Sequence, residues 1–246
     1  MKRWQLIPVA VLALVTASFG QDDPKKVIEK AVAAHGGAAT INKYGGVKIT
    51  SEDSIFIAGQ ELASTNELLI GYPNKQRNTS KVSIMGVTSV VVEKISPAGH
   101  SMTVDGAPQE VLDVTKKGAA MGFDKEAMLR LTPLLSDNSF TLKSLGTQKD
   151  DDKEFIVIEA SGKSLKSAKM YFDPATSLLT KFEFKGPSPK EVGKESVHVM
   201  TFSSFKETSG IKKPHKMVMN VDGERFMVQM VKEIQHLEKV DDAEFR

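Results

Sequence analysis

The sequence has 246 residues but no cysteine, and its single tryptophan is Trp4. Without cysteine the chain forms no disulfide framework, so a hydrophobic core has to stabilise it. The length allows such a core, because one all-β sandwich or barrel domain can reach roughly 200–250 residues. No cysteine follows the N-terminal apolar stretch either, where a lipid-anchored bacterial protein would need one.

Long apolar runs are also scarce. The run Leu6–Ala17 is far shorter than the roughly 20 residues that a membrane-spanning helix needs. It follows Lys2-Arg3 and leads into Ser18-Phe19-Gly20, which is the order of a secretory signal peptide. We therefore expect residues 1–20 to be removed after Gly20, leaving an exported chain with no stable membrane insertion. An uncleaved N-terminal anchor is the alternative.

An excess of positive charge is missing as well. The chain has 33 Lys and Arg against 31 Asp and Glu, and removal of residues 1–20 takes away Lys2 and Arg3, which leaves 31 of each sign. Affinity for nucleic acids rests on clustered positive charge. The sequence thus predicts no nucleic-acid partner.

Catalytic and metal-binding motifs are incomplete. Gly99-His100-Ser101-Met102-Thr103 has half of a Gly-x-Ser-x-Gly elbow, but Asp105-Gly106 predicts a hairpin turn where the elbow needs a helix. Three acidic clusters lack the glycine and alternating ligands of a calcium loop, which leaves only weak surface calcium binding open. These clusters are Asp22-Asp23, Asp150-Asp151-Asp152 and Asp241-Asp242. We predict a protein that is not an enzyme and needs no cofactor.

The five histidines show no metal-binding spacing. They are His35, His100, His198, His215 and His236. His35 stands just before Gly36-Gly37, which is a helix-ending pair. We expect a positively charged His35 to favour the C-terminus of that helix.

Helical patterns are few. Asp23-Pro24 is a good N-cap followed by proline at the first helical position, and apolar residues then recur at helical spacing up to Val32. A short turn is expected over residues 38–43. Residues 124–131 look like a second short helix.

In most of the remaining chain, apolar and polar residues alternate as in a β-strand, and turn-forming residues separate these alternating segments. The predicted strands cover residues 47–57, 62–72, 75–84, 87–95, 100–104, 140–145, 154–160, 168–173, 178–185, 196–205, 215–221 and 225–234. The charged run Lys149–Lys153 is interpreted as a solvated hairpin tip. A sheet of about a dozen strands must curl, and helices can cover its open face.

We therefore predict a mainly β fold with a few helices: a large curved antiparallel sheet, or half-barrel, covered on its concave side by helices. Residues 21–246 would form this single domain. A closed lipocalin-like barrel is the nearest structural alternative.

The last predicted hairpin, residues 215–230, carries four methionines around the turn Asp222-Gly223. A regular two-residue hairpin pairs each residue with the one that mirrors it across the turn. The expected pairs on one apolar face are Val221 with Glu224, Met219 with Phe226, Met217 with Val228, and His215 with Met230.

Methionine and phenylalanine dominate the predicted apolar face of the sheet, and methionine adapts to irregular apolar partners. This face is either the core beneath the helices or, in part, the lining of a cavity for acyl chains. Burial favours such chains at roughly 0.8 kcal/mol per CH₂. The candidate cavity residues are Met170, Phe172, Phe182, Phe184, Met217, Met219, Phe226, Val228 and Met230.

Several stretches resemble the outer-membrane lipoprotein-sorting (LolA/LolB-like) group of exported bacterial proteins. They are Val27–Ala31 with His35-Gly36-Gly37, Tyr72–Arg77, Tyr171–Lys181, Phe202, Phe205–Lys216 and Val240–Phe245. The resemblance covers most of residues 21–246 and is least in Pro108–Ser139. It implies a half-barrel with helices over its concave side, a cavity that in the carriers holds lipoprotein acyl chains, and no cofactor. It places no specific acyl-contacting arginine, although Arg77 lies in a predicted strand.

Three functional hypotheses follow. The first is a periplasmic protein that binds or carries lipid or a lipidated protein in the concave face. The second is an envelope interaction or sensor module, with an envelope protein as partner, whose sheet face is filled by its own helices. The third, a hydrolase that uses Ser101 or an unrecognised site, ranks last.

Overall fold

The computed structural model describes residues 23–84 and 86–246. The predicted signal peptide, its cleavage after Gly20 and the acidic residue Asp22 lie outside the described residues. Within them, no helix is long and apolar enough to cross a membrane.

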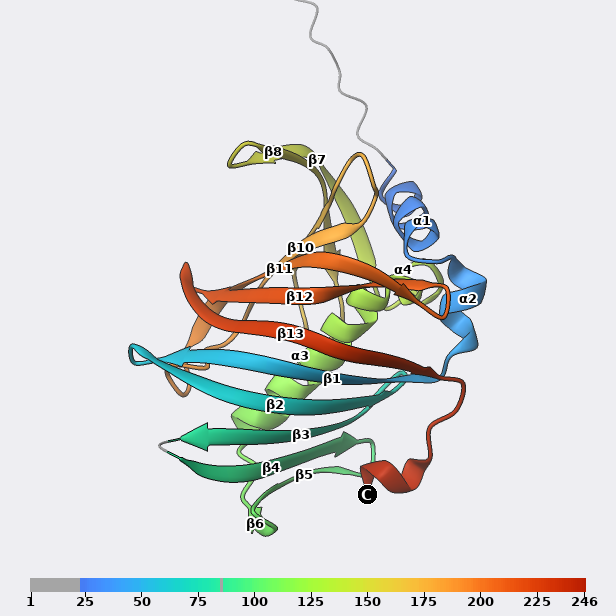
Figure 1. Ribbon diagram of the computed structural model, residues 1–246. Helices are drawn as coiled ribbons and strands as arrows, with labels where there is room; N and C mark the ends of the chain where they lie inside the picture. Colours follow the sequence, from blue (N-terminus) through green and yellow to red (C-terminus); the bar gives the residue numbers. More distant parts are fainter. Residues whose placement is uncertain (1–22, 85) are drawn as a thin grey trace, which may run out of the picture.

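The described chain consists of strands that form a single sheet and a few helices (Figure 1). The helices are α1 (Pro24–Ala34), α2 (Ala38–Lys43), α3 (Asp113–Arg130) and α4 (Pro133–Ser136), with the 3-10 helix η1 (Asp242–Phe245) at the end. The strands are β1 (Gly46–Ile57), β2 (Gln60–Gly71), β3 (Lys75–Ile84), β4 (Val87–Ser96), β5 (Gly99–Val104), β6 (Ala107–Gln109), β7 (Thr141–Asp150), β8 (Lys153–Ser161), β9 (Ala168–Phe172), β10 (Leu179–Pro187), β11 (Glu195–Thr208), β12 (Ile211–Val221) and β13 (Glu224–Leu237).

The sheet has 13 antiparallel strands in the order β6-β5-β4-β3-β2-β1-β13-β12-β11-β10-β9-β8-β7. The chain starts in the middle at β1 and moves strand by strand to the edge at β6. Helix α3 then leads to the opposite edge, and the chain returns from β7 to β13, which pairs with β1. In Figure 1, α3 passes behind the central strands. The predicted half-barrel with helices on one side is confirmed, and because β6 and β7 remain separate edges, the closed-barrel alternative is wrong.

Local turn chemistry explains why neighbouring strands pair. Four hairpins turn on two residues that both have positive φ, namely Ala58-Gly59, Asp105-Gly106, Ser209-Gly210 and Asp222-Gly223. Two positive φ values match the turn type whose twist suits antiparallel strands, and glycine adopts such values without strain. The predicted charged tip is also confirmed, because β7 and β8 meet at Asp151-Asp152.

The middle of the chain is more helical than predicted. Helix α3 spans 18 residues, whereas the sequence indicated only residues 124–131. Gly118 and Gly122 are unfavourable inside a helix, because each costs about 1 kcal/mol relative to alanine. Both nevertheless lie inside α3, where contacts with the rest of the protein outweigh this local preference.

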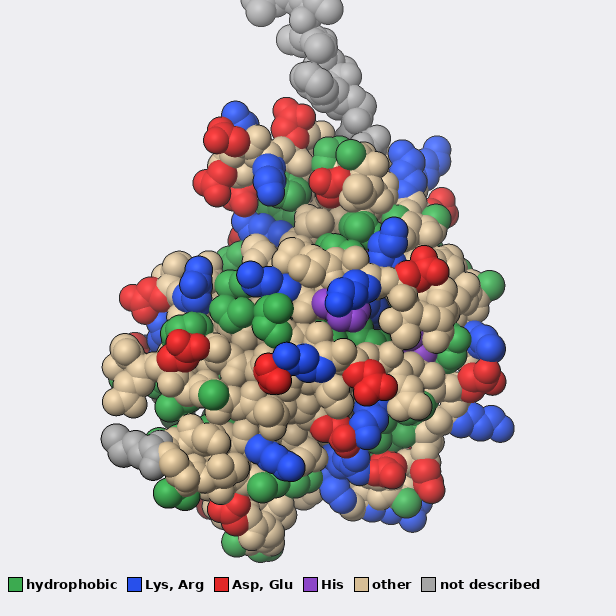
Figure 2. Space-filling view, in the orientation of Figure 1, with side chains coloured by type: hydrophobic (Ala, Val, Ile, Leu, Met, Phe, Trp, Pro, Cys, Tyr) green, Lys and Arg blue, Asp and Glu red, His purple; other side chains and the backbone are tan. Residues whose placement is uncertain are grey.

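Opposite charges are mixed on the outer face of the molecule. In the view of Figure 2, Lys and Arg side chains alternate with Asp and Glu side chains over this face. Part of the mixture is made of cross-strand ion pairs, such as Lys48 with Glu67 at 2.7 Å and Lys169 with Glu183 at 3.0 Å. This face therefore offers no broad positive surface.

The main core lies on the concave side of one half of the sheet. Side chains of β8 to β12 pack there against α1, α3 and α4. Ile28, Met128 and Leu134 from these three helices are at most 3% exposed. The same is true of Met170 and Phe182 from the sheet, which are fully buried. This half of the half-barrel is closed by the protein's own helices.

His35 fastens α1 to that half of the sheet. Its Nδ1 lies 2.7 Å from the carbonyl oxygen of Lys212, and its Nε2 accepts a hydrogen bond from the backbone N–H of Leu179 at 3.3 Å. Burial lowers the pKa of His35 to about 4, although the contact with Lys212 acts in the opposite direction. The imidazole is thus neutral at pH 7, with Nδ1 as the donor, and the expectation of a positive charge at this helix end is wrong.

We expect His35 to make folding sensitive to mild acid. Its pKa is about 4 when folded and near 6.5 when unfolded, so the unfolded state takes up the proton first. The stabilisation is complete above pH 6.5 and is lost as pH falls toward 4, by roughly 3 kcal/mol in all. The variant His35→Gln has no titrating group here and should show a flatter pH profile. Urea unfolding of both proteins between pH 4 and 7 measures the difference, and parallel profiles would contradict this assignment.

Candidate functional site

A cavity of about 470 Å³ lies on the concave side of the other half of the sheet, beneath α3. Its floor is formed by β1, β2 and β3 on one side and by β11, β12 and β13 on the other. The apolar lining residues are Ile49, Ile55, Leu68, Ile70, Val82, Leu129, Leu179, Met200, Phe202, Pro214, Met217, Met219, Met227, Val231 and Ile234. Cavities of 300–1,000 Å³ with mostly apolar walls are typical of small-molecule sites.

Methionine is concentrated on the β11–β13 side of the floor. Met200, Met217, Met219 and Met227 all line the cavity. Met200 on β11 is directly opposite Met219 on β12, which is in turn opposite Met227 on β13. Such a row of unbranched, polarizable side chains can repack around apolar partners of different shapes.

Two of the predicted cavity residues, Met217 and Met219, line this cavity. Four others belong to the packed half of the sheet instead. Met170, Phe172 and Phe182 are at most 1% exposed in the main core, and Phe184 packs against that core and stacks on His198 with ring centroids 4.8 Å apart.

The other three predicted residues, Phe226, Val228 and Met230, are not among the residues that line the cavity. A bulge in β13 is the reason. Asn220 pairs with Arg225, but Met219 pairs with Met227, so Phe226 is an additional residue and the alternation reverses beyond it. The predicted pairing of Met219 with Phe226 is wrong. Met227 is inward instead, and Met230 is 42% exposed.

The β1–β3 side of the floor was missed by sequence reasoning. Its apolar members are Ile49, Ile55, Leu68, Ile70 and Val82. Within a strand these residues are an even number of positions apart, so the sequence does indicate that they share one face. This signal was weak because polar residues stand between them on the same face.

Those polar residues form a polar stripe across the middle of the floor. It consists of Asp53 on β1, Ser64 and Asn66 on β2, Asn78 and Ser80 on β3, and Gln229 on β13. Pairing of the strands brings them together, since Asp53 is opposite both Ser64 and Gln229, and Asn66 is opposite Ser80. On β1 the floor is thus apolar at both ends and polar in between, whereas on β3 the polar lining continues through Gln76 to one end of the strand.

Charged side chains reach the cavity from its roof and rim. Lys125 and Glu126 extend from α3, and Lys213 from β12. Burial lowers the pKa of both lysines, while the negative charge of Glu126 acts in the opposite direction. Within residues 23–84 and 86–246, no carboxylate lies within 4.0 Å of either ammonium group.

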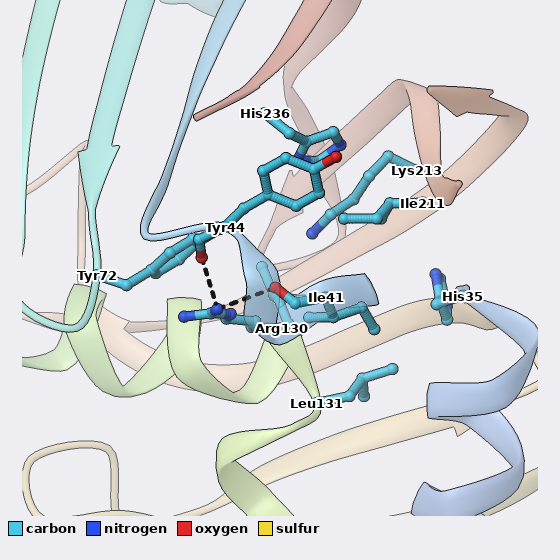
Figure 3. A pocket seen from close by; sticks show the side chains of 10 residues that line it. His35, Ile41, Tyr44, Tyr72, Arg130, Leu131, Ile211, Lys213 and His236 are labelled. Carbon is cyan, nitrogen blue, oxygen red and sulfur yellow. Dashed lines mark hydrogen bonds between the residues drawn. The ribbon is translucent and has the colours of Figure 1, made fainter. Parts of the chain in front are cut away.

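Arg130 fixes the C-terminal end of α3 at the edge of the cavity. Its guanidinium donates hydrogen bonds to the carbonyl oxygens of Ile41 at 3.1 Å and Tyr44 at 2.9 Å, as Figure 3 shows. The same group lies 3.8 Å from the centre of the Tyr72 ring. Only a small space of about 20 Å³ remains around these groups. This end of α3 is therefore tightly held.

The N-terminal end of α3 is held less firmly. No side chain caps its first turn, and the preceding Leu112 is 49% exposed. A second cavity of about 530 Å³ borders this end, between α3, β4 and the loop around Val192. Helix α3 is thus fixed at one end and partly unsupported at the other.

The remaining candidates lie away from the cavity. Ser101 is in the middle of β5, opposite Lys94, and the predicted hairpin turn follows that strand. Arg77 on β3 pairs with Glu67 at 3.0 Å and also with Glu244, and it is not among the cavity residues. In the part of the chain that the structure describes, no group of three or more His, Asp or Glu side chains could hold a metal ion.

Comparison of the sequence with protein-family models and with curated proteins finds no match. Solved structures do match. A domain from Vibrio parahaemolyticus with a provisional assignment to outer-membrane lipoprotein sorting has 15% identity and a TM-score of 0.57, over 91% of this chain and 97% of that one. A DUF1329 family protein from Desulfovibrio piger has 14% identity and a TM-score of 0.58, over 91% and 98%. A LolA superfamily protein from Nitrosomonas europaea has 11% identity and a TM-score of 0.54, over 91% and 97%.

The chain has a LolA-like fold. The resemblance inferred from sequence is confirmed at this level, and it extends over about nine-tenths of the chain. Identities of 11–15% establish the fold but transfer no residue roles. The function has to be argued from the cavity itself.

The two halves of the sheet should respond differently to the same truncation. Met170→Ala removes a fully buried side chain and should lower the free energy of unfolding by about 2–5 kcal/mol. Met219→Ala shortens a partly buried side chain beside a space that already exists and should cost less than Met170→Ala. Urea unfolding of the two variants measures both values. Equal large losses would mean that the Met219 side of the sheet is packed as tightly as the core.

Proposed function

We propose that this protein is a non-enzymatic periplasmic binding protein for lipid or for a lipidated protein, whose acyl chains occupy the cavity under α3. Residues 21–246 would be the mature domain after removal of the signal peptide. The cavity is the observation on which the proposal depends. It has a volume of about 470 Å³ and a floor rich in methionine and branched aliphatic side chains.

The energetics favour an acyl occupant. Each CH₂ group that leaves water gains roughly 0.8 kcal/mol, so a chain of a dozen carbons can bind without precise polar geometry. Along the apolar part of the wall, a hydrocarbon chain displaces water that makes few hydrogen bonds with the protein. The LolA-like fold supports the same conclusion. Of the solved structures that match it, one is named as a lipoprotein-sorting domain and another as a LolA superfamily protein.

Entry and release would use the less firmly held end of α3. Arg130 holds the C-terminal end against Ile41 and Tyr44, whereas Gly118 and Gly122 weaken the first half of the helix. Movement of that half would widen the second cavity, which shares Lys125 and Glu126 with the candidate cavity, and would loosen the contact of Met121 with the main core. A membrane or an acceptor protein would then receive the ligand.

The alternative of an envelope interaction module depends on a sheet face filled by the protein's own helices. This description fits the half of the sheet that holds Met170 and Phe182. It does not fit the half that holds Met219, where the cavity lies. The binding function is therefore the better supported of the two, and an envelope protein remains the expected acceptor.

The proposal predicts that filling the cavity removes bound lipid. Protein exported with its own signal peptide and purified without detergent should carry lipid in native mass spectrometry. Met219→Trp should reduce the lipid-bound fraction at least fivefold, because the larger side chain fills the cavity. Met230→Trp is the matched control, since Met230 is 42% exposed and outside the cavity.

Tryptophan fluorescence verifies where each new side chain lies. Trp4 is the only tryptophan and is within the predicted signal peptide, so the introduced indole is the sole one in residues 21–246. Emission should be shifted to shorter wavelength for Met219→Trp and should be that of an exposed indole for Met230→Trp. Wild-type protein that emerges without lipid and takes none from palmitoyl-lysophosphatidylcholine micelles would refute the proposal.

A further inference from the structure

The polar stripe on the cavity floor is a connected set of hydrogen bonds. Asp53 accepts through Oδ2 from Asn66 Nδ2 at 2.7 Å and from Gln229 Nε2 at 3.5 Å. Asn66 also donates to Ser64 at 3.1 Å and accepts from Ser80 through its Oδ1. Gln229 Nε2 also donates to Ser51 Oγ at 3.2 Å, so the donors of both amides have partners within the protein.

One acceptor remains. Asp53 is 7% exposed, and its Oδ1 is buried with no hydrogen-bond partner among the described residues. A buried carboxylate oxygen without a partner is costly, and burial accordingly raises the pKa of Asp53, although hydrogen bonding with Ser51, Gln229 and Asn66 acts in the opposite direction. The χ2 torsion of aspartate has broad energy wells, so a small rotation can redirect this oxygen without leaving its rotamer.

Packing alone does not explain these residues. A partly satisfied polar network is less stable than apolar side chains of the same size. The stripe nevertheless occupies the middle of the floor, with Ile49 and Leu68 toward one end of the strands and Ile55 and Val82 toward the other. A ligand group that donates a hydrogen bond would complete the network.

We propose that the polar stripe is a headgroup subsite, in which Asp53 accepts a hydrogen bond from a hydroxyl or amide N–H of a bound amphiphile. The acyl chain of the ligand would lie along the methionines of β11–β13. This inference rests on the proposed function and narrows its ligand class. An ionised Asp53 would repel a carboxylate or phosphate at this position, so the group bound here is a hydrogen-bond donor that carries no negative charge.

Two ligands with the same acyl chain test the subsite. Monopalmitoylglycerol offers free hydroxyl groups, whereas methyl palmitate offers no donor. Wild-type protein, stripped of lipid and refolded or obtained lipid-free, should bind monopalmitoylglycerol about tenfold more tightly, which is the contribution expected of one hydrogen bond to a charged acceptor. Competition with a fluorescent fatty-acid probe measures both dissociation constants.

Asp53→Asn changes the acceptor into a donor with little change in shape. The amide oxygen can still accept from Asn66, which places the NH₂ group where the unpaired oxygen was. The affinity ratio of the two ligands should fall towards one, because the amide N–H can donate an uncharged hydrogen bond to an oxygen atom of either ligand. Glu52→Gln is the matched control. It removes the same charge from the neighbouring residue on the outer face, where Glu52 pairs with Lys232 at 2.7 Å, and should leave the ratio unchanged.

The outcomes separate the two proposals. A wild-type ratio near one, or an unchanged ratio in Asp53→Asn, overturns the headgroup subsite and leaves acyl binding in place. Failure of the wild-type protein to bind either ligand overturns both. If Asp53→Asn does not fold, the wild-type ratio alone decides.

Discussion

Helix α3 has to carry the chain from one edge of a 13-stranded sheet to the other, and most of the functional architecture follows from that constraint. Eighteen residues make a rod of about 27 Å. A rod that crosses a curved sheet cannot follow its curvature over the whole width. It packs closely where it approaches β10, and it leaves space over the strands around β1 and β13. The cavity is therefore a consequence of topology.

The residues on the two halves of the floor differ accordingly. Under α1, α3 and α4 the sheet presents side chains such as Met170 and Phe182, which close-packed neighbours exclude from solvent. Around the cavity the same sheet presents a row of methionines and a polar stripe. Polar side chains in the unpacked half also oppose its collapse, because closing the cavity would bury them against the apolar roof residue Leu129. Stability and ligand access thus rest mainly on different strands of one sheet, and β11 and β12 contribute to both through Met200 and Met217.

Local chemistry made much of the fold predictable. The turns at Asp105-Gly106 and Asp222-Gly223 identified hairpins, and hairpins in sequence imply neighbouring antiparallel strands. The register of the last hairpin was not predictable in this way. Phe226 is as apolar as its neighbours, so nothing in the sequence marks it as the additional residue of a bulge. Because this bulge was not predicted, the inward and outward faces of β13 were interchanged in the prediction. Three candidate site residues were therefore assigned to the wrong face.

The polar stripe escaped prediction for a related reason. On β1, Thr50 and Glu52 face outward while Asp53 faces the cavity, so both faces of the strand contain polar residues. Alternation of polar and apolar residues therefore does not identify the inner face of this strand. Only the pairing of three strands reveals that Asp53, Asn66 and Ser80 converge. A hydrocarbon cavity with such a group in its floor favours ligands that have one donor and one long tail, because a plain hydrocarbon leaves the carboxylate unpaired and a fully polar ligand leaves the methionines uncovered.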